Sequence, residues 1–503
     1  MATATAARGN PQVDRFGPVH LWSVARTNPT HVRTEHEVVK FVARSGDPFT
    51  PGDCRGGAIC IRAPIEFWTT HAGSIPRGEA LGEMLIEEEA GKSVDKSALQ
   101  SNIDLRVSHV LEKQAEAGLD IINDGEQGRV GFQTYVTQRM SGFGGVSKRP
   151  YGKEFIEYPQ FTKRMMERLA KISKVFDAPQ ATADIRYRDT ALISAEIDRL
   201  TRLGAVVKPR VTEFFMNAPS PGIVATTMLN AHYASHEAYL DAVAREIRTE
   251  YLAVTKAGFV LQIDAPDLAM ERVLLFQDMS DMEYAKLVEQ HVAALNKALE
   301  GIPADRVRLH VCWGNWEGPH VHDVAMEVIL PALYQANVGA LGLEFANPRR
   351  QHESAALRKC RLPDKLILIP GVIDPKSNFV EHPEVVAQRI ETVVAAMGDR
   401  ERVIAGVDCG FGTFVGWEWV TEDVMWAKLA TLRAGRTSPR NGYGAGRRLE
   451  LSGMRRARNS ARPYDRGSAS VLRLPSRSPA LCSMLSTSQC PLPSSTALAR
   501  DLL

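Results

Sequence analysis

The stretch Arg-Leu-His-Val-Cys-Trp at residues 308–313 lies near the middle of this 503-residue chain and predicts a strand. Successive side chains of a strand point to opposite faces, so His310 and Cys312 share one face while Leu309 and Val311 share the other. Two metal-ligating side chains therefore stand together. A buried His and Cys on one strand are more often plain core than a metal site, so the pair gains meaning only from residues elsewhere in the chain.

Seven further segments predict strands, and helical patterns separate them. This alternation is typical of an α/β fold, and eight strands favour a (β/α)8 barrel over the competing doubly wound sheet. The predicted strands lie at 65–70, 119–126, 205–209, 259–264, 307–312, 340–345, 365–373 and 403–409, and the clearest helices at 103–118, 239–256, 282–299, 324–335 and 383–397.

The remaining segments predict additions to one large domain, residues 65–435. Residues 1–64 show no sustained period and predict a loosely ordered extension. Residues 145–203 carry charged helical patterns, which favour a helical insertion over one end of the barrel, where insertions commonly shape the substrate mouth. Residues 436–503 are rich in Arg, Ser and Pro and predict a disordered tail.

The charge of the chain is unevenly distributed. From Arg433 onward there are 13 Arg, no Lys and three acidic residues, although the net charge of the whole chain is only +2. Arg-rich tails can bind nucleic acid through phosphates. The only aromatic residues among these arginines are Tyr443 and Tyr464, which is few for a nucleic-acid-binding segment. Disorder or an out-of-frame sequence is therefore favoured, and no nucleic-acid partner is expected.

Composition indicates a soluble enzyme-sized protein without a membrane partner. The chain is 44% hydrophobic and 24% charged, and no apolar run is long enough to cross a bilayer. Residues 1–9 lack the charged and apolar regions of a signal peptide, so a cytoplasmic location is expected. The seven cysteines are odd in number and scattered, which favours reduced thiols available as ligands.

Polar residues stand at the predicted carboxyl ends of the strands, where barrels place their chemistry. A turn of small residues at 71–77 follows the first strand and brings backbone N–H groups toward an anion, unless it is an ordinary turn. One nitrogen, two sulfurs and one oxygen among these residues make a complete zinc ligand set, dispersed as in a catalytic site. That set is His310, Cys312, Glu344 and Cys409; the other residues at strand ends are Ser74, Asp124, Glu126, Asp264, Asp267, Asp374 and Asp408.

Over about residues 68–435 the chain resembles the catalytic C-terminal barrel of the cobalamin-independent methionine synthases. Seven motifs carry this resemblance. They are Thr-Thr-His-Ala-Gly-Ser at 69–74, Asp-Gly-Glu at 124–126, Gln-Ile-Asp at 262–264, His-Val-Cys at 310–312, Leu-Glu at 343–344, Pro-Gly-Val-Ile-Asp at 370–374 and Asp-Cys-Gly at 408–410.

The resemblance implies methionine biosynthesis by methyl transfer from 5-methyltetrahydrofolate polyglutamate to homocysteine, without cobalamin. Zinc would be held by the four residues named above, with Glu344 as the weak, displaceable ligand. A free thiol with a pKa of about 8.5 is only a few per cent ionised at pH 7, and metal binding removes that limit. The implied substrate-binding residues are Gly73, Ser74, Asp124 and Asp264, of which Asp264 would meet the amino group; the implied catalytic residues are Glu126 on the folate side, Asp374 and Lys376.

Departures from the family keep other functions open. Ala265 stands where the methionine synthases have Glu, and Lys376 stands where they have the proposed proton-donor His. Lys376 would act as an acid or pair with Asp374. No duplicated N-terminal barrel fits before Trp68, and residues 264–270 and 378–383 resemble the single-barrel branch that includes epoxyalkane:coenzyme M transferase. Thiol addition to an epoxide, a uroporphyrinogen decarboxylase-like barrel and an inactive scaffold are the alternatives, and the oligomeric state is open.

Overall fold

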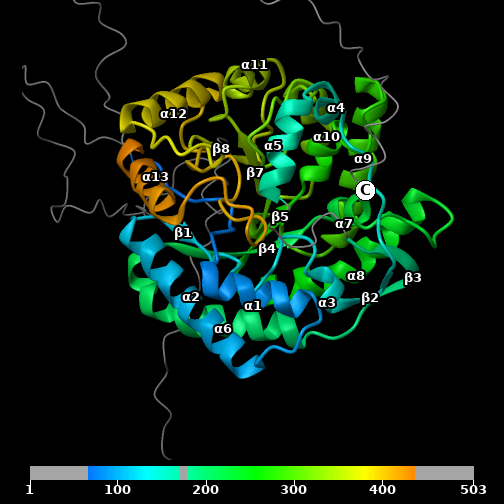
Figure 1. Cartoon of the computed structure of the whole chain (residues 1–503). Coiled ribbons are helices and arrows are strands. Elements are labelled where there is room, and N and C mark those ends of the chain that lie inside the picture. Colours follow the sequence, from blue (N-terminus) through cyan, green and yellow to red (C-terminus); the bar gives the residue numbers. More distant parts are fainter. Residues whose placement is uncertain (1–65, 170–177, 437–503) are drawn as a thin grey trace, which may run out of the picture. The chain divides into compact units, whose positions relative to one another are not determined.

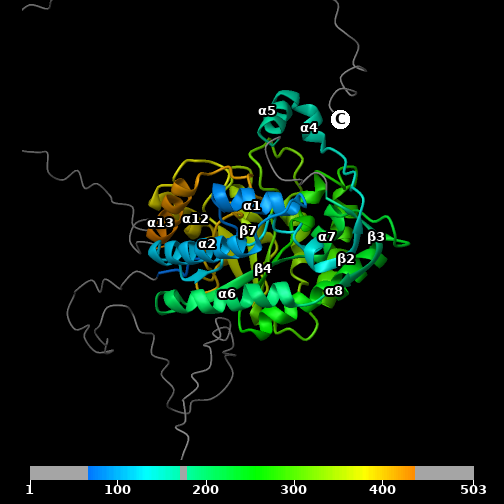
Figure 2. The ribbon, with the colours of Figure 1, turned by 60° about the horizontal axis from the view of Figure 1, so that its bottom comes forward.

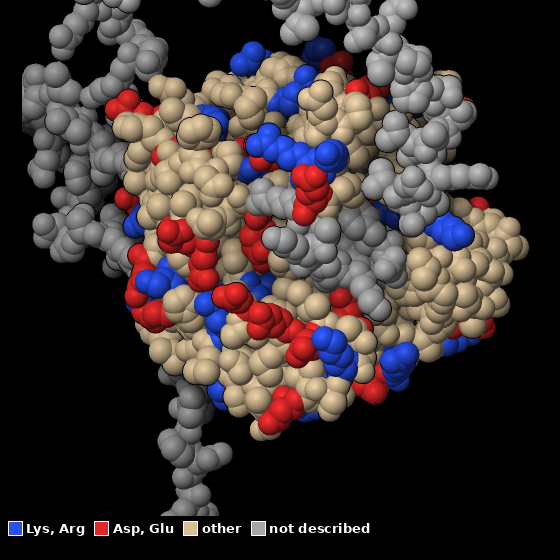
Figure 3. Space-filling model, in the orientation of Figure 1, with Lys and Arg blue, Asp and Glu red and all other residues tan. Residues whose placement is uncertain are grey.

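The computed structural model describes residues 66–169 and 178–436, all within the first of two compact units, Met1–Asn441. The extension expected at 1–64 and all of the tail expected at 436–503 except Arg436 lie outside the described residues. Within them, no helix is long and apolar enough to span a membrane. On the face shown in Figure 3, acidic and basic side chains are interspersed.

A curled parallel sheet forms the centre of the described region (Figure 1). Its six strands are ordered β1-β4-β5-β6-β7-β8, and every neighbouring pair is parallel. The strands are β1 (Ile121–Ile122), β4 (Glu213–Pro219), β5 (Val260–Asp264), β6 (Val307–His310), β7 (Ala340–Glu344) and β8 (Ile367–Gly371).

Two extended segments continue the sheet from β8 to β1. One lies at 403–406 beside β8, and the other, at Thr69, lies between that segment and β1. Leu368 and Gly371 of β8 form parallel bridges with Val403 and Gly406, and Ala405 forms one with Thr69. The Thr69 carbonyl in turn accepts a 3.1 Å hydrogen bond from the Ile121 amide of β1. The strands predicted at 65–70 and 403–409 are therefore isolated bridges here. The α/β class and the parallel sheet are confirmed.

One buried cluster shows how strongly the sheet curls. It gathers one apolar side chain from each of five strands and one from the bridged segment at 403–406, and all are 9% exposed or less. A flat sheet would keep these strands too far apart for one cluster, since neighbouring strands are about 4.8 Å apart. The members are Ile121, Phe215, Val260, Ala340, Ile369 and Ile404.

Long helices cover the outside of the sheet (Figures 1 and 2). Helix α2 begins where the Asp95 side chain accepts the Ser97 and Ala98 amides, and α9 begins with a capping box between Ser280 and Glu283. The covering helices are α1 (Glu79–Glu89), α2 (Lys96–Glu116), α6 (Ala191–Val207), α8 (His236–Lys256), α9 (Asp281–Ala298), α10 (Met326–Leu333), α12 (Pro383–Met397) and α13 (Glu422–Gly435); the shorter ones are α3 (Val136–Arg139), α7 (Pro221–Thr227) and α11 (Ala356–Lys359).

The strand predicted at 205–209 is wrong. Helix α6 continues to Val207, because Leu200, Gly204 and Val207 extend its buried face at helical spacing, and a 3-10 turn at Lys208–Arg210 follows. The strand at this place in the chain is β4, which begins at Glu213. The β-branched pair at 206–207 suggested a strand by propensity, and tertiary packing overrode it.

The segment expected as a helical insertion is mixed. Helices α4 (Lys153–Glu157) and α5 (Pro159–Leu169) lie in it, but so does strand β3 (Gln180–Tyr187). Strand β3 pairs antiparallel with β2 (Met140–Gly144). The last helix of the segment, α6, packs against α2 and α8 in the layer of helices that covers the sheet.

Candidate functional site

Two thiols from distant parts of the chain meet at the carboxyl end of the sheet. Cys312 follows β6, Cys409 follows the bridged segment at 403–406, and their sulfur atoms are 3.2 Å apart. Both thiols are free and buried. The hydrogen bond from Cys312 lowers the pKa of Cys409, while the same bond and burial raise the pKa of Cys312. The pair is therefore asymmetric, with Cys409 the more readily ionised thiol.

The His310 imidazole ends β6 and is held at both nitrogens. Nδ1 lies 2.9 Å from Asp264 Oδ1, and Nε2 lies 3.0 Å from the Asp408 carbonyl oxygen. Burial works against ionisation, but the Asp264 hydrogen bond and the nearby Cys409 outweigh it and raise the pKa of His310 to about 9. Its orientation is thus fixed by neighbours from two other strand ends.

Glu344, at the end of β7, forms a buried ion pair. Both of its carboxylate oxygens lie 3.3 Å from Lys376 Nζ, and Oε1 also accepts the Trp313 amide at 3.2 Å. Burial alone would lower the pKa of Lys376, but Glu344 and then Cys312 raise it above its usual range. Lys376 therefore brings a permanent positive charge beside the thiols. The Asp374 side chain meets only the Lys376 backbone N–H, at 3.1 Å, so the expected Lys376–Asp374 side-chain pair is not formed.

The four predicted zinc ligands are neighbours without forming a metal cage. Among residues 66–169 and 178–436, no three His, Cys, Asp or Glu side chains are placed to hold one ion together. Two thiolates 2.3 Å from a tetrahedral metal would be about 3.8 Å apart, so the sulfur atoms at 3.2 Å are slightly too close. His310 contacts Asp264 and the Asp408 carbonyl, and Glu344 pairs with Lys376. The donor types suit zinc, and the set remains a prediction.

The predicted anion-binding turn packs directly against the residues that follow Cys409. Gly73 has a φ of 121°, and a Cβ there would lie 2.3 Å from the Asn217 side chain, so only glycine fits. A Cβ on Gly410 would lie 1.9 Å from Ser74 Oγ. The Ser74 carbonyl also accepts the Phe411 amide at 2.9 Å. Ser74 and Cys409 are thereby fixed in one small region.

Both carboxylate oxygens of Asp264 meet protein groups. Its Oδ1 accepts the Gln262 side-chain amide at 2.7 Å and pairs with His310, and its Oδ2 accepts the Asn217 amide at 2.8 Å. The resemblance implied that this carboxylate meets a substrate ammonium group. In the structure it orients the imidazole, as carboxylates beside metal-ligating histidines do.

Glu126 is a buried carboxyl group in a strained backbone position. Its φ is 54°, in the left-handed region, and its Oε2 has no hydrogen-bond partner among the residues that the structure describes. Burial, and then the Asp264 charge, raise its pKa to about 8. Asp124 accepts the Glu126 amide at 3.0 Å, and burial raises the pKa of Asp124 as well. Glu126 can therefore hold a proton near neutral pH.

This raised pKa predicts how Glu126→Gln changes stability with pH. The native carboxyl keeps its proton up to about pH 8, whereas the unfolded one releases it near 4.5, so wild-type stability falls as pH rises between these values. At roughly 1.4 kcal/mol per pKa unit, we expect the Gln variant to gain a few kcal/mol over wild type between pH 4 and pH 9. Denaturant unfolding at both pH values measures this gain. A difference independent of pH would show that Glu126 ionises normally.

Two other strand-end acids have structural partners. Asp408 accepts three backbone amides, from Phe345, Ala346 and Asn347, at 2.7 to 2.9 Å. Asp267 lies 2.8 Å from His291 Nδ1. Sequence reasoning missed Asn217 because the strand that carries it was misplaced. It also missed Arg308, which stands in the opening motif two residues before His310 and therefore on the same strand face.

Comparisons with known proteins agree with one another. Residues 186–431 match the family model described as cobalamin-independent synthase, catalytic domain. The chain is 24% identical over 340 residues to a 2-hydroxypropyl-CoM lyase of Xanthobacter autotrophicus, covering 62% of this chain and 80% of that protein. It is 25% identical over 346 residues to a methionine synthase of Thermococcus kodakarensis, covering 68% and 86% respectively.

A solved structure supports the fold. It is a B12-independent methionine synthase from a Shewanella species in complex with selenomethionine. The similarity has a TM-score of 0.55 at 20% identity and covers 74% of this chain and 97% of the other. At this identity the similarity shows the fold alone.

Proposed function

Through residues 186–431 the chain belongs to the cobalamin-independent synthase catalytic-domain family, and we propose that it catalyses zinc-dependent alkylation of a small thiol. The observation that carries this proposal is the contact between the buried thiols of Cys312 and Cys409, with His310 and Glu344 beside them. We also infer that the curled sheet closes as a (β/α)8 barrel, because the bridged segments at Thr69 and 403–406 occupy the two remaining strand positions.

His310, Cys312, Glu344 and Cys409 would hold the zinc ion, which when bound would lower the pKa of a substrate thiol so that it reacts as a thiolate. Glu344 must leave Lys376 to join this set. The Lys376 side chain, which is 4% exposed, would then remain beside the thiols and neutralise part of their negative charge. Lys376 therefore supports the reaction as a fixed charge, in addition to the acid role that its place in the family motif implies.

The leading reaction is methyl transfer from a folate to homocysteine, which gives methionine. Gly73, Ser74 and Asp124 would bind the amino acid, whose carboxylate would meet the turn. The leaving nitrogen of the folate needs a proton. Glu126, whose pKa is raised to about 8, would supply one, and Asp374 accepts the Lys376 backbone N–H and would position that segment.

One observation favours a second candidate, the addition of an amine-free thiol to an epoxide. Oδ1 of Asp264 already meets Gln262 and His310, and Oδ2 accepts from Asn217, so a substrate ammonium group would have to share Oδ2 with a protein donor. Ala265 also replaces the acid that the methionine synthases have next to this aspartate. The similarity to a 2-hydroxypropyl-CoM lyase is consistent with this reading.

A panel of substrates separates these reactions. Purified zinc-loaded protein is incubated with homocysteine or coenzyme M, each with 5-methyltetrahydrofolate or epoxypropane, and thioether products are measured by mass spectrometry. Methionine formation would establish the leading function, and a hydroxyalkyl thioether would establish the second. Absence of product in all four mixtures would favour the inactive scaffold.

Asp264→Asn is expected to weaken zinc binding and to lower activity on homocysteine and on an amine-free thiol by similar factors. The amide keeps the size of the side chain but removes the charge that orients His310, and changes of this kind typically cost about tenfold or more. Chelator competition and the thiol KM for both substrates measure the effect. A loss confined to homocysteine, with zinc affinity unchanged, would instead support the ammonium-anchor role that the family implies.

A further inference from the structure

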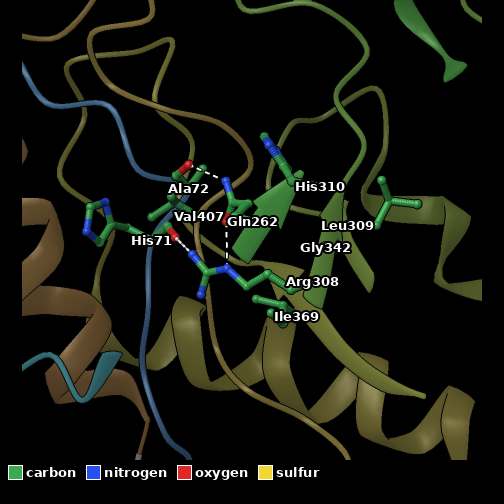
Figure 4. Close-up of a pocket in the computed structure, with 9 residues that line it drawn as sticks. All are labelled: His71, Ala72, Gln262, Arg308, Leu309, His310, Gly342, Ile369 and Val407. Atoms are coloured by element: carbon green, nitrogen blue, oxygen red, sulfur yellow. Dashed lines mark hydrogen bonds between the residues drawn. The ribbon is translucent and has the colours of Figure 1, made fainter. Parts of the chain in front are cut away.

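A buried arginine lies directly beneath the site (Figure 4). Arg308 of β6 is 2% exposed, and its guanidinium stacks 3.5 Å from the centre of the Phe215 ring. Nε donates to Gln262 Oε1 at 2.7 Å, and the terminal nitrogens donate to Thr70 Oγ1 and to the His71 carbonyl at 2.9 Å each. All three acceptors are neutral groups, so the charge is buried without a counter-ion in contact, which is costly.

Through Gln262 the guanidinium reaches His310. The Gln262 side-chain amide donates to Asp264 Oδ1 at 2.7 Å, and the same oxygen lies 2.9 Å from His310 Nδ1. The order of contacts is therefore Arg308, Gln262, Asp264 and His310. Because each group is buried and bonded to the next, a displacement of the guanidinium is transmitted to the imidazole.

The same guanidinium also holds the turn at 71–74. It binds Thr70 and His71 directly, and Gln262 donates a second bond to the Ala72 carbonyl at 2.5 Å. A cavity of about 10 Å³, which has room for a single water, borders these groups. In the intact protein there is therefore little room for water among the acceptors that the guanidinium serves.

We propose that Arg308 is a positioning residue that couples the anion-binding turn at 71–74 to His310, so that this turn and the imidazole keep a fixed relative placement. The inference rests on the proposed function, which gives the turn its role in substrate binding and His310 its role in zinc binding. It assigns the coupling to a side chain that touches neither thiol and that none of the catalytic roles above uses.

Arg308→Lys tests the coupling, because lysine keeps the charge and loses the planar fork that serves three acceptors. Zinc affinity is measured by competition with a chelator, using zinc alone as the probe. Hydrogen exchange of peptides covering 70–76 and 310–314 is measured in the metal-free protein. We expect roughly tenfold weaker zinc binding and faster exchange in both peptides.

Arg306→Lys is the matched control. Arg306 is also buried, at 7% exposure, and lies two residues earlier, where it binds Glu213 and the Gly258 carbonyl. Its substitution is expected to lower the melting temperature at most, with zinc affinity and exchange at 70–76 unchanged. If Arg308→Lys behaves like this control, or loosens only one of its two peptides, the coupling is refuted.

A second variant keeps the proposal testable if Arg308→Lys does not fold. Gln262→Glu keeps an acceptor for Arg308 and gives it a counter-ion, but loses the N–H that binds Asp264 and Ala72. The same weakening of zinc binding and the same faster exchange are expected, and unchanged values would overturn the proposal. A wild-type chain that binds no zinc would refute the proposed function, and the exchange measurements would then decide the coupling alone.

Discussion

Cys409→Ser is expected to abolish both zinc binding and activity. Cys409 is one of the two sulfur donors of the proposed zinc site and is the thiol whose pKa is lowered by its partner, whereas a serine hydroxyl does not ionise near neutral pH. The variant loses a soft ligand and leaves Cys312 without its 3.2 Å contact. Metal content by plasma mass spectrometry and turnover with the thiol panel measure the two losses.

Cys360→Ser is the control for this experiment. Cys360 is a free, partly buried cysteine at the end of α11, and its carbonyl binds Tyr334. Its substitution should leave metal content and turnover within about twofold of wild type. Full activity in a wild-type preparation that contains no zinc would contradict the role assigned to Cys409.

Lys376→Met is expected to destabilise the metal-free protein by about 3 kcal/mol, because removal of one partner leaves the other charge buried and uncompensated. The side chains of Lys376 and Glu344 are 4% and 1% exposed, so solvent cannot screen the remaining carboxylate. Zinc should restore much of this loss, since a bound cation would neutralise Glu344 in place of the ammonium. Denaturant unfolding with and without zinc gives both values.

A second buried pair offers the matched control. Lys428 and Glu381 lie 2.9 Å apart with side chains 0% and 8% exposed, and neither belongs to the predicted ligand set. Lys428→Met should cost less than Lys376→Met, because Arg389 still lies 3.7 Å from Glu381, and its loss should show no recovery when zinc is added. Equal behaviour of the two variants would show that Lys376 and Glu344 form an ordinary structural ion pair.

The parallel sheet was predictable because its strands alternate with helices of clear amphipathic spacing. The strand at 307–312 and its neighbours at 259–264 and 340–345 were found within two residues of their observed ends. The strand at 213–219 was missed, because the preceding β-branched pair belongs to the end of α6. Sequence alone cannot show that Val207 packs on a helix face.

The candidate site was predictable as a set of residues, and less so as a set of contacts. Strand-end placement brought Cys312 and Cys409 together as expected, because parallel strands end at one edge. The pairing of Glu344 with Lys376 could not be foreseen, because the two residues are 32 positions apart and the sequence does not show which side chains the fold brings into contact. The contact between Asn217 and Asp264 was missed because the strand that carries Asn217, β4, was misplaced.

The close packing of glycines at this edge limits how the protein can be re-engineered. A methyl group at Gly73, Gly371 or Gly410 would come within 2.4 Å of Asn217, Asp408 or Ser74 respectively. Mutant libraries that aim to change which thiol is accepted should therefore leave these three codons fixed. Phe379, which is 85% exposed on the loop after Lys376, carries no such restriction, because a new side chain there meets water instead of backbone.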